Sequence, residues 1–169
     1  MRRTIKQIFD KQKIFDFSLK FLSFLSNWKL TMLLIPPITK LLARLNLFLN
    51  RPKPVKDLKE LAETWKALMP SDGQENFRFT GLSGQTAFVE IHLHCPLRGT
   101  GKVNACYLFM NYDRSLLESI GGSLTVLESQ SNSGKSYCKL AIRRREDSID
   151  DLIPAHLNIE NRSINHNIY

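Results

Sequence analysis

The spacing of apolar residues changes from helical to alternating partway along this 169-residue chain, and that change limits the folds open to it. Over residues 55–69 apolar side chains recur every three or four positions, at Leu58, Leu61, Trp65 and Leu68, as in an amphipathic helix. Pro70-Ser-Asp-Gly73 ends this helix, and over 85–94 apolar and polar residues alternate as in a half-buried strand. Helices must therefore pack on a sheet, which predicts an α+β fold.

The glycine-containing turns in the rest of the sequence predict a ββαββ order with antiparallel hairpins. Gly81-Leu-Ser-Gly84 is expected to be the turn between the first two strands, and Gly121-Gly122 is expected to stop the long helix. Apolar residues make up 43% of the chain, enough for a packed core. The expected strands are 75–80, 85–94, 124–130 and 136–144, and the expected helix is 103–120.

Arg51-Pro-Lys-Pro54 is the predicted boundary between two parts of the chain, because both prolines favour extended backbone. Residues 1–50 form a basic amphipathic helical segment, with one helix over 4–27, a break at Pro36-Pro37 and a second helix over 38–50. Residues 55–146 form the α+β domain. The polar, Asn-rich tail 147–169 is expected to fray.

The excess positive charge lies entirely in the first third of the chain. Residues 1–56 contain 12 Lys and Arg against two acidic residues, Asp10 and Asp16. With its dense Phe and Leu, this composition suits helices in a membrane interface, so we expect an anionic membrane surface or a membrane-protein complex as partner. The alternative is that these helices pack on the domain. Aromatic residues are not interleaved with basic ones, so sequence-specific nucleic-acid binding is not expected.

The longest charge-free stretch of the N-terminal segment, residues 30–39, is half the length of about 20 residues that a spanning helix needs. Charged residues also interrupt the apolar run that a signal peptide would require. Three cysteines, an odd number, argue against a disulfide framework and for a reducing compartment. A cytoplasmic protein peripheral to the membrane is therefore expected.

The predicted topology brings the three cysteines to one end of the sheet. Cys95 follows the second strand, Cys106 lies in the first turns of the helix, and Cys138 lies near the start of the fourth strand. There the helix dipole and unpaired amides would favour thiolates. Thiolates suit zinc or an iron–sulphur cluster, with His94, His92, Asp113 or an external group as the fourth ligand. The alternative is that the cysteines are plain buried thiols.

The loop Gly99-Thr-Gly-Lys102 lies between a strand and a helix, where its amides, with Arg98 and Lys102, would hold a small anion beside the cysteines. A flexible loop explains the same residues. An enzyme would use Cys95 or Cys106 as nucleophile and His94 as base. A subunit that only mediates interactions is the third possibility. Asp113 and Arg114 are expected to form a surface pair, with a catalytic role as the alternative.

Several of these residues together resemble a known family. His94-Cys-Pro-Leu97, then Cys106, Ile120-Gly-Gly122 and Ser133-Gly-Lys-Ser-Tyr-Cys138, resemble the C-terminal sensor domain of Suf-operon repressors and related winged-helix regulators. The resemblance covers about residues 77–144 and implies that the three cysteines bind an iron–sulphur cluster. No winged helix is recognisable in residues 1–74. A more distant similarity is to vinyl-reductase-type small-molecule-binding domains and thiazoline-carboxylate hydrolases.

Overall fold

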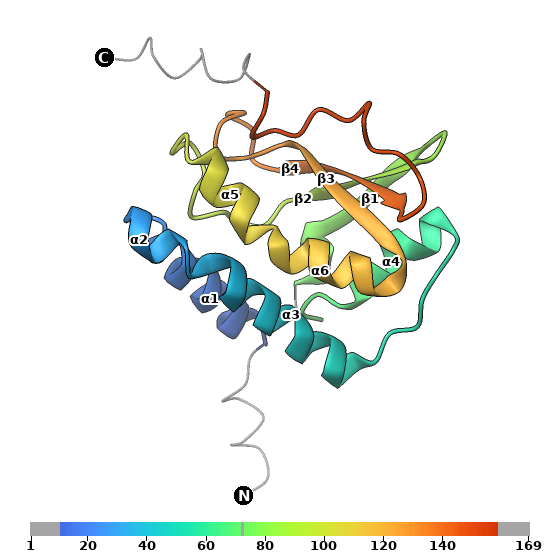
Figure 1. Cartoon of the computed structure of the whole chain (residues 1–169), viewed down its shortest axis with the longest axis horizontal. Coiled ribbons are helices and arrows are strands. Elements are labelled where there is room, and N and C mark those ends of the chain that lie inside the picture. Colours follow the sequence, from blue (N-terminus) through green and yellow to red (C-terminus); the bar gives the residue numbers. More distant parts are fainter. Residues whose placement is uncertain (1–10, 72, 159–169) are drawn as a thin grey trace, which may run out of the picture.

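The computed structural model describes residues 11–71 and 73–158, which form an α+β fold (Figure 1). A four-stranded sheet is combined with helices, as the sequence predicts. In chain order the elements are α1 (Lys11–Leu25), α2 (Lys29–Met32), α3 (Ile35–Asn50), α4 (Leu58–Ala67), a 3-10 turn η1 (Gln74–Asn76), β1 (Phe77–Ser83), β2 (Thr86–Ile91), α5 (Val103–Phe109), α6 (Asn111–Ile120), β3 (Gly122–Glu128) and β4 (Cys138–Arg144).

The sheet joins two hairpins through their second strands. Its order is β1-β2-β4-β3, and every neighbouring pair is antiparallel. The central pair β2–β4 aligns Val89 with Leu140, and β4 contributes the fully buried Leu140 and Ile142 to the core. The predicted ββαββ order is therefore confirmed.

Two predicted boundaries differ from the structure. The predicted turn over 81–84 is shorter, because β1 continues to Ser83 through a bulge at Gly81, where the pairing register shifts. Gly81 has a φ of 154°, which a residue with a side chain rarely adopts. The predicted helix 103–120 is divided into α5 and α6 at Met110, whose ψ is 0°. It ends as predicted, with Gly121 in the left-handed conformation.

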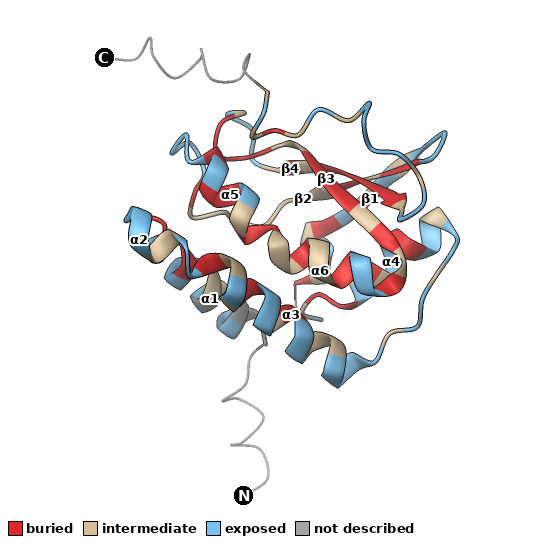
Figure 2. Ribbon diagram, viewed as in Figure 1, coloured by how far each residue is buried: buried red, intermediate tan, exposed pale blue. Residues whose placement is uncertain are grey.

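The core lies between the sheet and the helices α4 and α6 (Figure 2). Asp57 caps the start of α4 by accepting a hydrogen bond from the Glu60 amide at 2.9 Å. The buried face of α4 carries Leu61 and Trp65, and the Trp65 ring meets Phe77 edge to face at 5.5 Å. The helical stripe read from the sequence therefore faces the sheet.

The N-terminal helices pack on this domain through one face of α3. This helix begins at Ile35, so the predicted break at Pro36-Pro37 is wrong. The first turn of a helix needs no proline N–H and therefore accepts both prolines. α3 lies against α6, and its residues Ile35, Thr39 and Ala43 are buried. The alternative, that these helices pack on the domain, thus holds for one face of α3.

The segment after β4 is held rather than frayed, as far as it is described. The Arg143 guanidinium binds the Asp151 carboxylate, with Nη2 and Oδ2 2.7 Å apart, and Arg144 binds Asp147. The Ala155 amide donates to the Val126 carbonyl on β3 at 2.8 Å. Acidic residues placed opposite the strand arginines explain this departure from the predicted fraying. Residues 159–169 of the predicted tail, and residues 4–10 of the predicted first helix, lie outside the described residues.

Candidate functional site

A cavity of about 430 Å³ lies between helices α1 and α3 and the rest of the domain. Helices α1 and α3 line one side, and the end of α4, the two halves of the broken helix and the ends of β2 and β4 line the other. Most of the lining is apolar. Among the lining residues are Leu19, Leu22, Leu42, Leu68, Phe77, Ile91, Leu93, Phe109 and Met110.

All three cysteines line this cavity, and none is in a disulfide. Cys95 comes from the loop after β2, Cys106 from α5, and Cys138 is the first residue of β4, paired with Ile91 of β2. Cys106 and Cys138 are buried, and Cys95 is half-buried. The strand and helix ends thus supply three sulphur atoms to the walls of one cavity.

Each sulphur accepts a backbone or hydroxyl hydrogen bond from a nearby residue. The Leu97 amide lies 3.4 Å from Cys95 Sγ, the Ser129 hydroxyl 3.0 Å from Cys106 Sγ, and the Gln130 amide 3.4 Å from Cys138 Sγ. Such donors stabilise a thiolate, but burial acts in the opposite direction and is the larger effect. The three thiols therefore remain protonated at neutral pH.

Burial raises the pKa of Cys106 to about 11 and that of Cys138 to about 12, and it also raises the pKa of Cys95. A neighbouring cysteine adds to the rise at Cys106 and Cys138. The Cys106 N–H itself donates to the Lys102 carbonyl within the helix and so does not stabilise a thiolate. The expectation of activated thiolates is therefore not met.

The predicted metal ligands do not all meet. His94 is exposed and is not among the cavity-lining residues, and His92 instead pairs with Glu90 at 2.8 Å. Within residues 11–71 and 73–158, no three His, Cys, Asp or Glu side chains are grouped closely enough to hold a metal ion. The hydrogen-bond donors at each sulphur suit a thiolate that binds a metal. The described side chains, however, do not form a complete set of metal ligands.

The loop predicted to hold an anion is tied to its neighbours. The amides of Gly99 and Gly101 donate to the Gln130 and Ser131 carbonyls, at 3.0 and 2.8 Å. The Arg98 guanidinium binds Gln130 Oε1 at 2.7 Å, and Lys102 Nζ binds Asn27 Oδ1 at 2.6 Å. These contacts fix the loop beside the cysteines, and an anion there would have to compete with them.

Sequence reasoning missed a polar cluster in the same cavity. Asp113 is buried rather than on the surface, and its carboxylate accepts a hydrogen bond from Trp65 Nε1 at 3.1 Å. Asn46 Nδ2 donates to the Tyr112 hydroxyl at 2.7 Å and to the Leu68 carbonyl at 2.9 Å. Burial raises the pKa of Asp113 to about 6 and that of Tyr112 to about 12. The one sequence signal for this cluster is the seven-residue spacing from Cys106 to Asp113, which places both residues on the same face of a helix.

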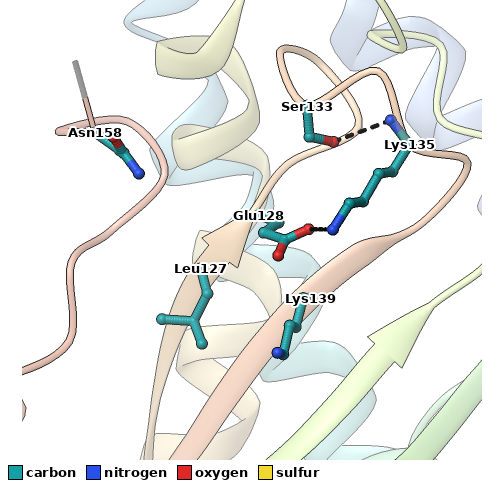
Figure 3. Close-up of a pocket in the computed structure, with 6 residues that line it drawn as sticks. All are labelled: Leu127, Glu128, Ser133, Lys135, Lys139 and Asn158. Atoms are coloured by element: carbon teal, nitrogen blue, oxygen red, sulfur yellow. Dashed lines mark hydrogen bonds and ion pairs between the residues drawn. The ribbon is translucent and has the colours of Figure 1, made fainter. Parts of the chain in front are cut away.

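A second, smaller pocket of about 300 Å³ lies at the end of the β3–β4 hairpin (Figure 3). Its two lysines are already engaged. Lys135 pairs with Glu128, as Figure 3 shows, and the Lys139 ammonium lies 5.3 Å from the centre of the Phe88 ring. The larger cavity is therefore the better candidate site.

Comparison with known proteins adds no assignment to this geometry. No protein-family model, curated protein or solved structure matches the chain. The similarity to the sensor domain of Suf-operon repressors stays a prediction, and the function must be inferred from the cavity itself.

Proposed function

We propose that this protein is a binding protein whose cavity takes an apolar small molecule. The observation that supports this most is the cavity of about 430 Å³ between α1, α3 and the cysteine-bearing wall. Ligand sites in proteins are typically about 300–1,000 Å³, mainly apolar, and contain a few polar groups that fix orientation. The Asn46–Tyr112 pair and Asp113 provide such groups.

The buried thiols fit this use better than nucleophilic catalysis. A protonated thiol is a small apolar group that packs well against a ligand and is a poor nucleophile. The pKa values of Cys106 and Cys138, about 11 and 12, keep both thiols protonated near neutral pH. His94, the base of the predicted enzyme, lies outside the cavity lining.

We expect the neutral dye N-phenyl-1-naphthylamine to bind the purified full chain and to increase in fluorescence. Ser18→Phe should weaken this binding at least tenfold, because Ser18 lines the cavity and a phenyl group would occupy ligand space. Fluorescence titration in vesicle-free buffer measures the affinity.

Ser119→Phe is the matched control. Both serines lie on helices and donate their hydroxyl to the carbonyl four residues earlier, at 2.9 Å, but Ser119 does not line the cavity. The control should bind the dye as the wild type does. Equal dye affinities of the Ser18 variant and the wild type, with both folded by circular dichroism, would contradict the proposal.

A thiolate-bound metal, zinc or an iron–sulphur cluster, is a second candidate, supported by the three cysteines that line one cavity. Cys95, Cys106 and Cys138 would be its ligands, and a bound metal would supply either a structural link or electron transfer. Each thiol would lose its proton on binding, and the raised pKa values make that loss costly. Metal affinity should therefore rise with pH.

Anaerobic titration with Co²⁺ tests this candidate. We expect a near-ultraviolet thiolate-to-cobalt absorption band that strengthens from pH 7 to 9 and is lost in Cys138→Ser. His94→Ala tests whether the exposed imidazole is a fourth ligand. The variant should leave the band unchanged if only the cysteines bind the metal. The absence of a thiolate band in the wild type at pH 9 would remove the metal candidate and leave the apolar-ligand proposal standing.

A further inference from the structure

The outer face of α1–α3 exposes an unusual amount of apolar surface. Twelve of the 17 large apolar side chains that are exposed in the described part of the chain lie between residues 14 and 49. Phe17 is 70% exposed, Leu30 82% and Leu33 73%. Soluble monomers rarely expose a continuous apolar patch of this kind unless something binds to it.

The apolar residues follow a helical stripe on α1. Phe17, Phe21 and Phe24 recur every three or four positions and are all exposed, and Trp28 continues the stripe beyond the helix. Leu22, on another side of α1, is buried and lines the cavity. The helix thus covers the cavity with one face and presents aromatic rings to the outside with the other.

The same arrangement occurs on α3. Leu41, Leu45 and Phe48 face outwards, whereas Thr39 and Ala43 are buried against the domain. Figure 2 shows this division as exposed and buried patches along the same helix. α3 is therefore anchored on one side and apolar on the other.

The charges on helices α1–α3 are mostly positive. Lys20, Lys29, Lys40 and Arg44 are exposed on α1–α3, whereas Asp16 is the one acidic residue between positions 11 and 56. Basic residues beside an outward apolar stripe are the pattern of helices that lie in the interface of an anionic bilayer. The charge complementarity favours acidic lipid headgroups as the occupant of this face.

We propose that the exposed face of α1–α3 docks on an anionic lipid bilayer and that the cavity opens onto that bilayer. Ile14, Leu45 and Leu49 line the cavity and are themselves exposed, so its mouth lies on the docking face. This second part rests on the proposed ligand-binding function. It identifies the ligand class as apolar molecules dissolved in the membrane.

The contacts of α3 favour a helix lying along the membrane. Residues Lys29–Asn50 form a helical stretch long and apolar enough to span a bilayer by length and composition. The Asn46 amide, however, bonds to the Leu68 carbonyl and to Tyr112, and Ile35 is fully buried against the domain. A spanning α3 would have to break these contacts.

Vesicle sedimentation tests the docking. The full chain should bind vesicles of phosphatidylcholine with phosphatidylserine about tenfold or more tightly than vesicles of phosphatidylcholine alone. The double variant Phe17→Ser/Phe24→Ser should lose about tenfold in affinity for the anionic vesicles. Its matched control is Ile153→Ser/Leu157→Ser, which removes two equally exposed apolar side chains from the C-terminal segment and should bind as the wild type does.

A charge-reversal pair isolates the electrostatic part. Lys40→Glu/Arg44→Glu should reduce binding to anionic vesicles at least tenfold, whereas Lys59→Glu/Arg78→Glu, on α4 and β1, should reduce it less. Equal binding to neutral and anionic vesicles, or equal losses from the two pairs, would overturn the choice of an anionic bilayer. A dimer in vesicle-free buffer that Phe17→Ser/Phe24→Ser dissociates would instead assign the face to a second copy of the chain.

Brominated lipids test the position of the mouth. In a Trp28→Phe background, the fluorescence of Leu45→Trp should be quenched by brominated lipid, and that of the control Leu157→Trp should not. If Leu45→Trp is unquenched while vesicle binding persists, the mouth does not face the bilayer. The dye titration in vesicle-free buffer does not depend on either result, so failure of docking and failure of ligand binding are separable.

Discussion

Raising the pH from 4.5 to 7.5 is expected to shift the free energy of unfolding of Asp113→Asn, relative to that of the wild type, by about 2 kcal/mol in favour of the variant. Burial raises the pKa of Asp113 to about 6 from an ordinary value of 3.8. The folded protein therefore binds this proton more tightly than the unfolded chain does. The wild type loses stability as the pH rises from about 4 through 6, and the neutral asparagine avoids that loss.

Asparagine suits this test because it keeps the shape of the side chain and a carbonyl oxygen for the Trp65 N–H. Urea unfolding at the two pH values gives the difference in the free energy of unfolding for each protein. Glu63→Gln, which removes an exposed carboxylate from α4, controls for the loss of one surface charge. Parallel pH profiles for wild type and Asp113→Asn would show that burial does not hold a proton on this carboxyl.

Gly121→Ala should destabilise the fold by about 3 kcal/mol, because two separate costs add at this position. Gly121 has a φ of 98°, which disfavours any side chain. A Cβ there would also lie 3.0 Å from the Val55 carbonyl oxygen, in the segment whose amide donates to the Ile120 carbonyl at 2.8 Å. Crowding this backbone would separate the start of the domain from the end of α6.

Gly134→Ala measures the first cost alone. Gly134 also has a positive φ, 71°, but nothing lies within 4 Å of the Cβ position. It should lose only about 1 kcal/mol. Chemical denaturation of both variants gives the two free energies, and equal losses would mean that the approach of Val55 carries no cost.

The sheet could be predicted because its strands follow local rules. Alternation over 85–94 and glycines at the hairpin and helix ends locate β2 and the end of α6 without tertiary information. The division at Met110 has no such signal, since neither Gly nor Pro lies between Val103 and Ile120. The bulge at Gly81 likewise depends on how β1 pairs with β2, and the local sequence does not show that pairing.

The candidate site could be predicted only in its outline. Strand and helix order places three cysteines at one cavity, but the rise in their pKa depends on how completely other elements bury them. The Asn46–Tyr112 contact joins residues 66 positions apart and follows from the docking of α3 on α6. Distances of this kind are set by tertiary packing and leave no periodic trace in the sequence.

The backbone hydrogen bond from Ala155 to Val126 occupies part of one outer edge of the sheet. The sheet has two outer strands, β1 and β3, and an uncovered outer strand invites a foreign strand to extend the ladder. The chain's own C-terminal segment occupies part of β3, where the Val126 carbonyl is already satisfied. The register shift between Phe79 and Gly81 likewise interrupts β1, so neither outer strand offers a long, regular ladder along its whole length.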